Sequence, residues 1–141
     1  MERYCRQVYY YETDKMAIVH NANYLRIFEE ARLFFMEQLG VPYTMIEDAG
    51  ILIPVVDAYV RYRQTLQYGD TFYVDVKLST FNGVRMVFEY EIRRKGDEAL
   101  ITTGHSSHCF IDENTRKPVS LKRRMPEAYE LILSKEVLAN E

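Results

Sequence analysis

The clearest pattern in the chain is a helical repeat of hydrophobic residues that begins near residue 22. Between Ala22 and Gln38, and just beyond, apolar residues recur three or four positions apart and would form one stripe on a helix: Tyr24, Ile27, Phe28, Ala31, Phe35 and Leu39. Charged residues fall on the other side: Arg26, Glu29, Arg32 and Glu37. Asn21 or Asn23 can cap the start of this helix, and Gly40 followed by Pro42 ends it. We therefore expect a long amphipathic helix that buries one face.

The rest of the chain is dominated by patterns typical of β-strands. Strict alternation of apolar and polar residues, the signature of a half-buried strand, occurs in two segments: 72–79 and 85–93. Residues that favour strands are concentrated in three others: 4–11, 51–64 and 98–111. Turn-forming residues separate the later strands at three places: 67–70, 82–83 and 95–97. The second of these, Asn82-Gly83, is the strongest hairpin signal in the chain.

Three further segments complete the predicted order of elements. Residues 12–20 carry no helical period and are expected to form a loop before the long helix. Residues 43–49 predict a short helical turn, and residues 126–138 predict a terminal helix with proline in its first turn.

This order predicts an α+β fold in one domain over residues 1–141. Consecutive hairpins require antiparallel pairing, so the long helix must cover one face of a single sheet. One helix against five strands makes a thin core, while the chain contains 12 Tyr and 7 Phe. Aromatic residues that cannot hide under the helix would favour a partner subunit.

Composition narrows the class of protein. Apolar residues make up 48% of the chain and charged residues 28%, which is typical of a soluble globular protein. The formal net charge is −3 and no basic stripe is present, so no nucleic-acid partner is expected. No segment approaches the roughly 18–20 apolar residues of a membrane span, and none resembles a secretory signal. Cys5 and Cys109 form no CxxC pair, so free thiols and a cytoplasmic location are expected.

The loop before the long helix holds the first candidate for chemistry. Asp14 lies between a strand and a helix start, where free backbone N–H groups and the helix dipole stabilise negative charge. Such a site could stabilise the oxyanion that forms when a carbonyl is attacked, and a nearby carboxylate could make that attack or orient a water. The alternative is that Asp14 only accepts hydrogen bonds within a loop turn.

A longer motif around Asp14 resembles a known family. The segment Tyr10 to Arg32 contains Glu-Thr-Asp, then Ala-Ile-Val-His-Asn-Ala-Asn-Tyr-Leu-Arg, then Phe-Glu-Glu-Ala-Arg. It is similar to the signature of 4-hydroxybenzoyl-CoA-type thioesterases of the hotdog-fold superfamily, a branch that includes the Tol-Pal-associated acyl-CoA thioesterases. Weaker similarity continues through Tyr62 and the turn at 68–70 to about residue 111.

The resemblance implies a hotdog fold, a five-stranded antiparallel sheet wrapped around one long helix. It further implies that Asp14 is the nucleophile or general base toward the thioester carbonyl and that the backbone N–H of Asn21 polarises that carbonyl. Within the same motif, Ala17, His20 and Tyr24 are expected to contact the substrate. The family also implies a homodimer, or a dimer of dimers, with active sites at the subunit interface.

Two positions depart from the family pattern. Many relatives have Gly where this chain has Ala17, and some have His where it has Asn21. A backbone donor survives the second change, but an imidazole at that position does not. His20 is the nearest imidazole, and it either faces the substrate or packs at the helix entry.

A CoA substrate also needs cations for its phosphates and space for its acyl group. Arg85, with Asn82 in the adjacent turn, is the preferred phosphate contact because relatives place basic residues near this hairpin. Arg61 and Arg63 are weaker candidates, and each of these residues could simply be a solvated strand charge. Three residues either line an acyl pocket or fill the core: Phe34, Phe35 and Met36.

Other kinds of site are disfavoured. His108 and Cys109 lie near His105 in the sequence, but neighbouring strand residues point to opposite faces and no further ligands accompany them, so no metal is expected. Ser106 and Ser107 lack a nucleophile-elbow motif. We expect no cofactor. The predicted activity is hydrolysis of acyl-CoA to a carboxylic acid and CoA; the alternatives are an acyl-thioester hydratase or dehydratase, and a non-catalytic acyl-CoA-binding module.

Overall fold

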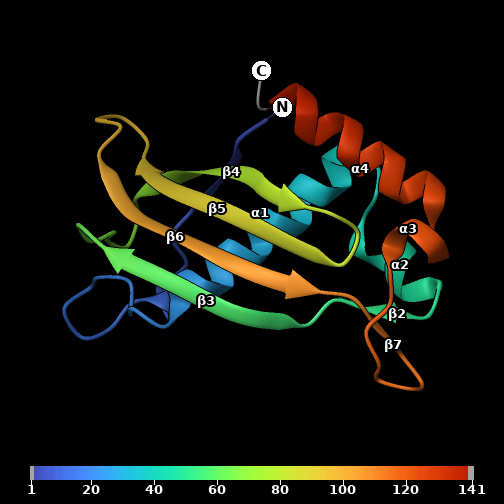
Figure 1. Ribbon diagram of the computed structural model, residues 1–141. Coiled ribbons are helices and arrows are strands. Elements are labelled where there is room, and N and C mark those ends of the chain that lie inside the picture. Colours follow the sequence, from blue (N-terminus) through green and yellow to red (C-terminus); the bar gives the residue numbers. More distant parts are fainter. Residues whose placement is uncertain (1, 140–141) are drawn as a thin grey trace.

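The computed structural model describes residues 2–139, and the side chains of residues 2–135. Its main sheet is antiparallel and has the strand order β1-β4-β5-β6-β3. These strands have the following bounds: β1 (Tyr4–Gln7), β3 (Val55–Tyr62), β4 (Thr71–Phe81), β5 (Arg85–Arg94) and β6 (Leu100–Cys109). The sheet curves around α1 (Asn23–Leu39), which passes behind it in Figure 1. The predicted hotdog architecture is therefore confirmed.

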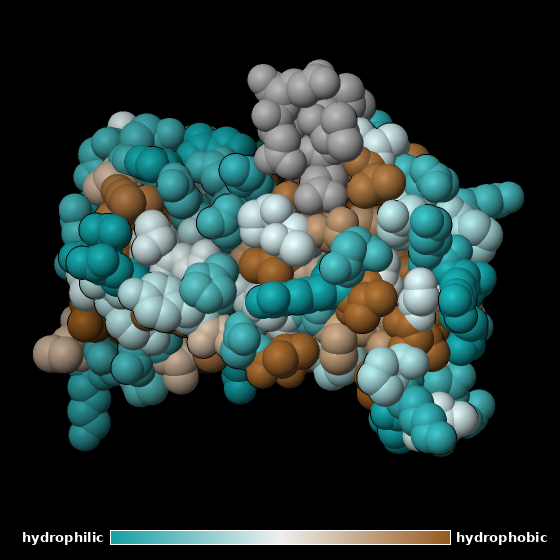
Figure 2. Space-filling model, in the orientation of Figure 1, coloured by the Kyte–Doolittle hydropathy of each residue, from teal (hydrophilic) through white to brown (hydrophobic). Residues whose placement is uncertain are grey.

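The predicted apolar stripe of α1 forms the centre of the core. All six of its residues are buried, and the Phe28 ring stacks on the Tyr90 ring of β5 with 4.3 Å between centroids. Gly104 of β6 permits this approach, because a Cβ there would lie 2.5 Å from the Phe28 ring. A side chain at residue 104 would push α1 away from the sheet. The outer face of the sheet is mixed, with hydrophobic residues scattered among hydrophilic ones (Figure 2).

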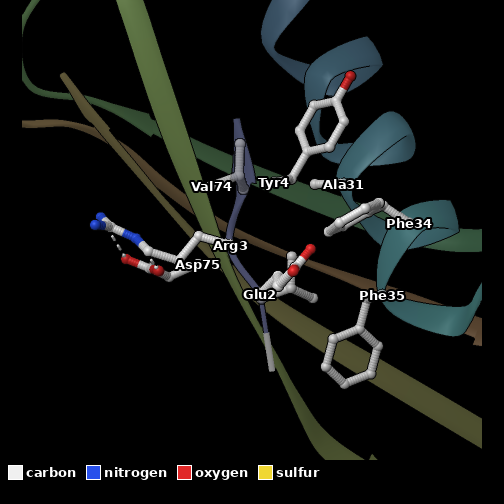
Figure 3. Close-up of a pocket in the computed structure, with 9 residues that line it drawn as sticks. Glu2, Arg3, Tyr4, Ala31, Phe34, Phe35, Val74 and Asp75 are labelled. Atoms are coloured by element: carbon white, nitrogen blue, oxygen red, sulfur yellow. Dashed lines mark hydrogen bonds and ion pairs between the residues drawn. The ribbon is translucent and has the colours of Figure 1, made fainter. Parts of the chain in front are cut away.

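Phe34, Phe35 and Met36 lie in or beside this core. Met36 is fully buried and Phe35 nearly so, with its ring edge-on to Phe88. Phe34 and Phe35 border a hollow of only about 90 Å³ between β1 and α1 (Figure 3). None of the residues predicted to bind substrate lines this hollow, so its geometry favours the core assignment for all three.

Four short elements and a longer helix extend the fold. They are β2 (Ile51–Leu52), which pairs with β7 (Ile111–Asp112), the helices α2 (Tyr43–Asp48) and α3 (Leu121–Arg124), and α4 (Pro126–Ala139). α3 was not predicted, and α2 and α4 agree with the expected helical segments. The described helices include none that is long and apolar enough to cross a bilayer.

Three strand predictions were too long. The first strand stops at Gln7, because Val8 donates its N–H to the Asp70 carbonyl and a 3-10 turn, η1 (Tyr10–Glu12), follows. The segment 51–64 splits at residues 53–54 into β2 and β3, and Pro54 cannot donate to a strand ladder. The segment 98–111 likewise divides into β6 and β7.

Two predictions about the long helix were also wrong. Neither Asn21 nor Asn23 caps it through a side chain: Ala22 occupies the N-cap position, and the Asn23 side chain binds the Glu12 carbonyl instead. Arg32 was assigned to the exposed side, yet it is only 6% exposed because its guanidinium reaches tyrosine hydroxyls between α1 and the sheet.

Candidate active site

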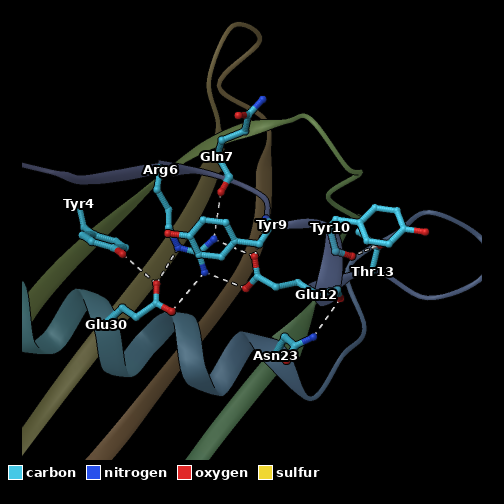
Figure 4. A network of polar contacts seen from close by, with 9 residues as sticks. All are labelled: Tyr4, Arg6, Gln7, Tyr9, Tyr10, Glu12, Thr13, Asn23 and Glu30. Carbon is cyan, nitrogen blue, oxygen red and sulfur yellow. Dashed lines mark hydrogen bonds and ion pairs between the residues drawn. The ribbon is translucent and has the colours of Figure 1, made fainter.

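The loop that carries Asp14 is closed at Glu12. The carbonyl oxygen of Glu12 accepts a hydrogen bond from the His20 N–H at 2.8 Å and another from the Asn23 side chain at 2.9 Å. Both ends of the segment 13–20 are thereby held at one residue, beside the first turn of α1 (Figure 4). A short bridge between Thr13 and Val19 narrows the loop further.

A buried ion pair fixes Glu12 itself. Arg6 of β1 donates to the Glu12 carboxylate at 2.8 Å, and the Tyr9 N–H donates to the same carboxylate at 2.8 Å. Burial alone would raise the pKa of Glu12, but the hydrogen bonds from Arg6 and Tyr9 outweigh it and lower the pKa. Arg6 also contacts Glu30 of α1 at 2.7 Å, so one guanidinium joins strand, loop and helix (Figure 4). This is a rigid support for the loop.

Asp14 is half-buried and its carboxylate is oriented by the loop. Oδ1 accepts the Met16 N–H at 2.8 Å, and the Asp14 N–H donates to the Ile18 carbonyl at 2.9 Å. Among the described residues, no hydrogen bond to Oδ2 is present. The side chain lines a hollow of about 250 Å³. Asp14 therefore accepts a hydrogen bond within the loop turn, which was the predicted alternative to a catalytic role. Its Oδ2 is still open to a ligand.

Asn21 lines the same hollow at the start of α1. Its carbonyl oxygen accepts the Tyr62 hydroxyl at 3.0 Å and the Tyr24 N–H at 3.4 Å, which fixes the orientation of the loop–helix junction. No acceptor for the Asn21 N–H is found among the described residues. A free N–H at the positive end of a 17-residue helix can stabilise an oxyanion.

His20 is exposed at the edge of this hollow and supports the helix start. Its Nδ1 accepts the Ala22 N–H at 3.2 Å, which holds the imidazole against the residue before α1, while no side chain caps the helix itself. This contact favours packing at the helix entry over a role in proton transfer.

Tyr24 forms the buried wall of the hollow. Only 2% of it is exposed, and its ring lies edge-on to the Tyr62 ring with 5.5 Å between centroids. Its hydroxyl lies 3.5 Å from the Leu66 N–H. Tyr62 was noted only as a matching position, yet it lines the hollow and orients Asn21.

A second hollow of about 480 Å³ adjoins the other side of the Asp14 loop. Asp14 and Ala17 line it together with four residues that were not predicted as site residues: Tyr10, Thr13, Lys15 and Tyr68. The Tyr10 and Tyr68 rings meet edge-on at 5.5 Å, and 75% of Tyr10 is exposed. The signal available in the sequence was the run Tyr9-Tyr10-Tyr11 at the start of the motif.

Asn82 and Arg85 do not reach either hollow within this chain. They lie at the β4–β5 turn, whereas Asp14 lies near Tyr62 and Gln64, beyond the opposite end of β3. The Asn82 side chain accepts the N–H groups of Val84 and Arg85 and so stabilises the hairpin. Arg85 could approach an Asp14 site only from a second copy of the chain.

The two histidines of β6 are separated by the sheet. His105 is exposed and stacks on Tyr59, whereas His108 is fully buried beside Phe88. Within the described residues, no three His, Cys, Asp or Glu side chains are grouped to hold a metal ion. Cys5 and Cys109 are free thiols.

Comparison with known proteins identifies the family. The model of the thioesterase-like superfamily matches residues 8–130. The protein named "Putative acyl-CoA thioesterase YneP" of Bacillus subtilis is 37% identical over 127 residues, covering 88% of this chain and 91% of that protein. A solved DHNA-CoA thioesterase from Staphylococcus aureus is 33% identical with a TM-score of 0.92, covering 98% of this chain and 92% of that one. The family model and these relatives show that this chain belongs to the thioesterase-like superfamily.

Proposed function

We propose that the protein hydrolyses acyl-CoA thioesters, with Asp14 as the catalytic carboxylate and the Asn21 N–H as the oxyanion donor. The observation that carries this proposal is their placement: the carboxylate and the helix start line one hollow of about 250 Å³. A thioester carbonyl bound there would lie between a negative oxygen and a polarising amide. Such a pair supports attack on a carbonyl carbon.

Two routes fit this geometry. In one, Asp14 attacks the carbonyl carbon, the C–S bond breaks to release CoA as thiolate, and water then hydrolyses the mixed anhydride. In the other, Asp14 removes a proton from water as the water attacks, and the C–S bond breaks in the same way. One oxyanion donor contributes roughly 2.7–4 kcal/mol to lowering the barrier, and a positioned base about 10²–10⁴-fold in rate. Thioesters are activated, so this small set of groups suffices.

The relatives support CoA as the carrier group. A second protein of Staphylococcus aureus, solved in complex with CoA, has the same fold with a TM-score of 0.85 at 19% identity. Several relatives are named 1,4-dihydroxy-2-naphthoyl-CoA hydrolases, including one of Thermosynechococcus vestitus that is 25% identical. Placement in the 4-hydroxybenzoyl-CoA-type and Tol-Pal-associated branch rests on the motif from Tyr10 to Arg32, and it stays a prediction, as does a cytoplasmic location.

Release of free thiol from a panel of acyl-CoAs tests the activity. We expect Asp14→Asn to lower kcat/KM by about 10²–10⁴-fold, because it removes the nucleophile or base. Asp48→Asn is the matched control, since Asp48 is an exposed carboxylate of α2 far from the loop in sequence. Thermal stabilisation by acyl-CoA without thiol release would indicate a binding module instead. Loss of 2-enoyl-CoA absorbance would indicate a hydratase.

The active unit is proposed to be a homodimer joined through β3. β3 is an edge strand of the sheet, and seven of its eight residues are exposed. Its exposed apolar residues include Val55, Val56 and Tyr59, at 53%, 62% and 50%. A free, apolar edge of this length is a ready template for pairing with another strand. When β3 of a second copy pairs with it, the unpaired backbone N–H and C=O groups of both edge strands form hydrogen bonds.

The sequence of β3 is complementary to itself. If two copies pair antiparallel about Tyr59, Asp57 of each copy lies opposite Arg61 of the other. The same pairing brings the start of the partner's β3 to the end that holds Tyr62 and Asp14. The second subunit would thus complete the wall of the hollow and could bring its β4–β5 hairpin, with Arg85, toward a bound CoA. A dimer of dimers would need a further surface.

A further inference from the structure

Arg32 is a buried cation without a buried counter-charge. Only 6% of it is exposed, and no described carboxylate forms a salt bridge with it. Its Nε donates to the Tyr43 hydroxyl at 3.1 Å and its Nη1 to the Tyr90 hydroxyl at 3.0 Å. A guanidinium has five N–H groups, so the protein leaves donors of Arg32 unused. A buried charge with neutral partners alone is costly, and an anion would offset that cost.

The buried groups in contact with Arg32 are neutral, whereas the Glu29 carboxylate, which is close enough to act on Tyr43 and Tyr90, is exposed. Burial raises the pKa of Tyr43 to about 12, although nearby Arg32 acts in the opposite direction. The pKa of Tyr90 is likewise raised by burial. Burial, together with the Arg32 charge, lowers the pKa of His108 to about 4. Neither the tyrosines nor the histidine therefore supplies a charge that neutralises Arg32 near pH 7.

Hydrogen bonds link Arg32 to a buried polar cluster on β5 and β6. Tyr90 accepts from Arg32, and its hydroxyl lies 2.6 Å from Ser106 Oγ, a contact in which either oxygen can donate. Ser106 Oγ lies 2.8 Å from Nε2 of His108, and His108 Nδ1 has no partner among the described residues. These contacts hold the guanidinium of Arg32 in one orientation.

Arg32 and Ser106 form one end of a recess of about 230 Å³ between α1 and β3. Its walls are mainly apolar, from Leu25, Phe28, Val55 and Ala58. Arg26 and Glu29, one cation and one anion, lie at its exposed rim. Arg32 is nine residues beyond Asn23, the first residue of α1, and so about 13 Å from it along the helix; Asn21, the proposed oxyanion donor, lies two residues before Asn23. Ala58 is a similar distance, about 13 Å, from Tyr62 along β3.

We infer that this recess binds the far end of the substrate's acyl group, and that the far end carries a carboxylate which pairs with Arg32. The inference rests on the proposed function, since it places the thioester carbonyl between Asp14 and Asn21. The apolar walls then contact the methylene chain, and the guanidinium receives the terminal anion. The substrate class is the mono-CoA thioester of a medium-chain dicarboxylic acid.

Two CoA esters of equal chain length test this assignment. Suberoyl-CoA and octanoyl-CoA differ only in a carboxylate or a methyl group at the eighth carbon. We expect the wild type to favour suberoyl-CoA by about tenfold or more in kcat/KM, as a charge-assisted hydrogen bond to a buried cation implies. Arg32→Gln should bring the ratio to about one. Arg26→Gln removes an exposed cation from the rim and should retain most of the preference, because solvent screens that charge.

Binding separates this inference from the proposed activity. Titration calorimetry on Asp14→Asn measures the dissociation constants of both esters without turnover, and Arg32 is intact in that protein. Tighter binding of suberoyl-CoA by about tenfold supports the carboxylate site even if no thiol is released from either ester. Equal binding, or tighter binding of octanoyl-CoA, overturns the inference while leaving hydrolysis possible. This comparison decides the matter even if Arg32→Gln fails to fold.

Discussion

Ala17 adopts a backbone conformation that favours glycine, with a φ of 62°. Its N–H and carbonyl both serve the loop, as donor to Asp14 at 3.0 Å and acceptor from Tyr68 at 3.1 Å. A left-handed conformation costs a non-glycine residue roughly 1–2 kcal/mol, and glycine returns about 0.5–1 kcal/mol of that through its more flexible unfolded state. We expect Ala17→Gly to raise the free energy of unfolding by up to about 1 kcal/mol, measured by urea denaturation.

Ala22 provides the matched control for this change. It precedes α1 with helical angles, a φ of −65° and a ψ of −23°. Glycine there relieves no backbone strain and only makes the unfolded chain more flexible. Ala22→Gly should lower the free energy of unfolding by about 0.5–1 kcal/mol. Destabilisation of similar size by both glycine substitutions would show that residue 17 carries no strain. On this expectation, Ala17, which stands where many relatives have glycine, lowers the free energy of unfolding by an amount that the loop tolerates.

Single residues were the hardest to place from the sequence. The resemblance of the segment from Tyr10 to Arg32 to a known family implied that Asp14 and Asn21 lie together, and the structure brings them to one hollow. Arg32 was misplaced because helical periodicity marks which residues are apolar, whereas its partner Tyr90 is 58 residues away. The Arg6–Glu12 ion pair was invisible for the same reason, since it depends on where η1 turns the chain.

At the scale of elements, β6 carries a pH-sensitive contact. His108 is fully buried on this strand, and burial together with Arg32 lowers its pKa to about 4 from the ordinary histidine value of 6.5. Between these values the unfolded chain binds a proton that the folded chain does not, so stability falls as pH falls from about 6.5 toward 4. We expect a loss of roughly 2 kcal/mol between pH 7 and pH 5 from this residue.

Urea denaturation at both pH values measures that loss, with His108→Gln as the comparison. The variant lacks the titrating ring, so its stability should change much less over the same interval. Glu12 does not confound the measurement: its pKa is lowered, so its contribution to stability is lost only below the ordinary glutamate pKa of 4.5. An equal pH dependence in both proteins would assign the effect to other groups.

The regular elements could be predicted because their patterns are local. Alternation in 72–79 and 85–93, with Asn82-Gly83 between them, predicted the β4–β5 hairpin, and Asn82 does stabilise its turn. Residues 8–11 were assigned to a strand because tyrosine favours strands. They turn instead, since the Glu12 carboxylate binds the Tyr9 N–H and Arg6 across the turn. The pairing of Arg6 with Glu12, six residues apart, thus overrides strand propensity at the boundary that shapes the site.

At the scale of the whole molecule, the surface around the site contains a strand edge that no other strand of the chain covers. The hollow of Asp14 and the recess of Arg32 both border β3, the strand whose outer edge is unpaired. Both would be enclosed if a second copy paired along that strand. Enclosure would exclude water and strengthen the electrostatic contacts within the site. Activity and assembly should therefore be lost together.

The register of that pairing can be tested by exchanging charges on β3. If Asp57 of one copy faces Arg61 of the other, Asp57→Arg sets like charges together at two symmetric places, and Arg61→Asp does the same. We expect each single change to raise the dissociation constant of the dimer by about tenfold or more, followed by analytical ultracentrifugation, and to lower thiol release in parallel. The double variant Asp57→Arg with Arg61→Asp restores opposite charges and should recover both properties. If the single variants stay dimeric, or if the double variant is as weak as either one, then these strands do not pair about Tyr59, and the site must be completed by another surface.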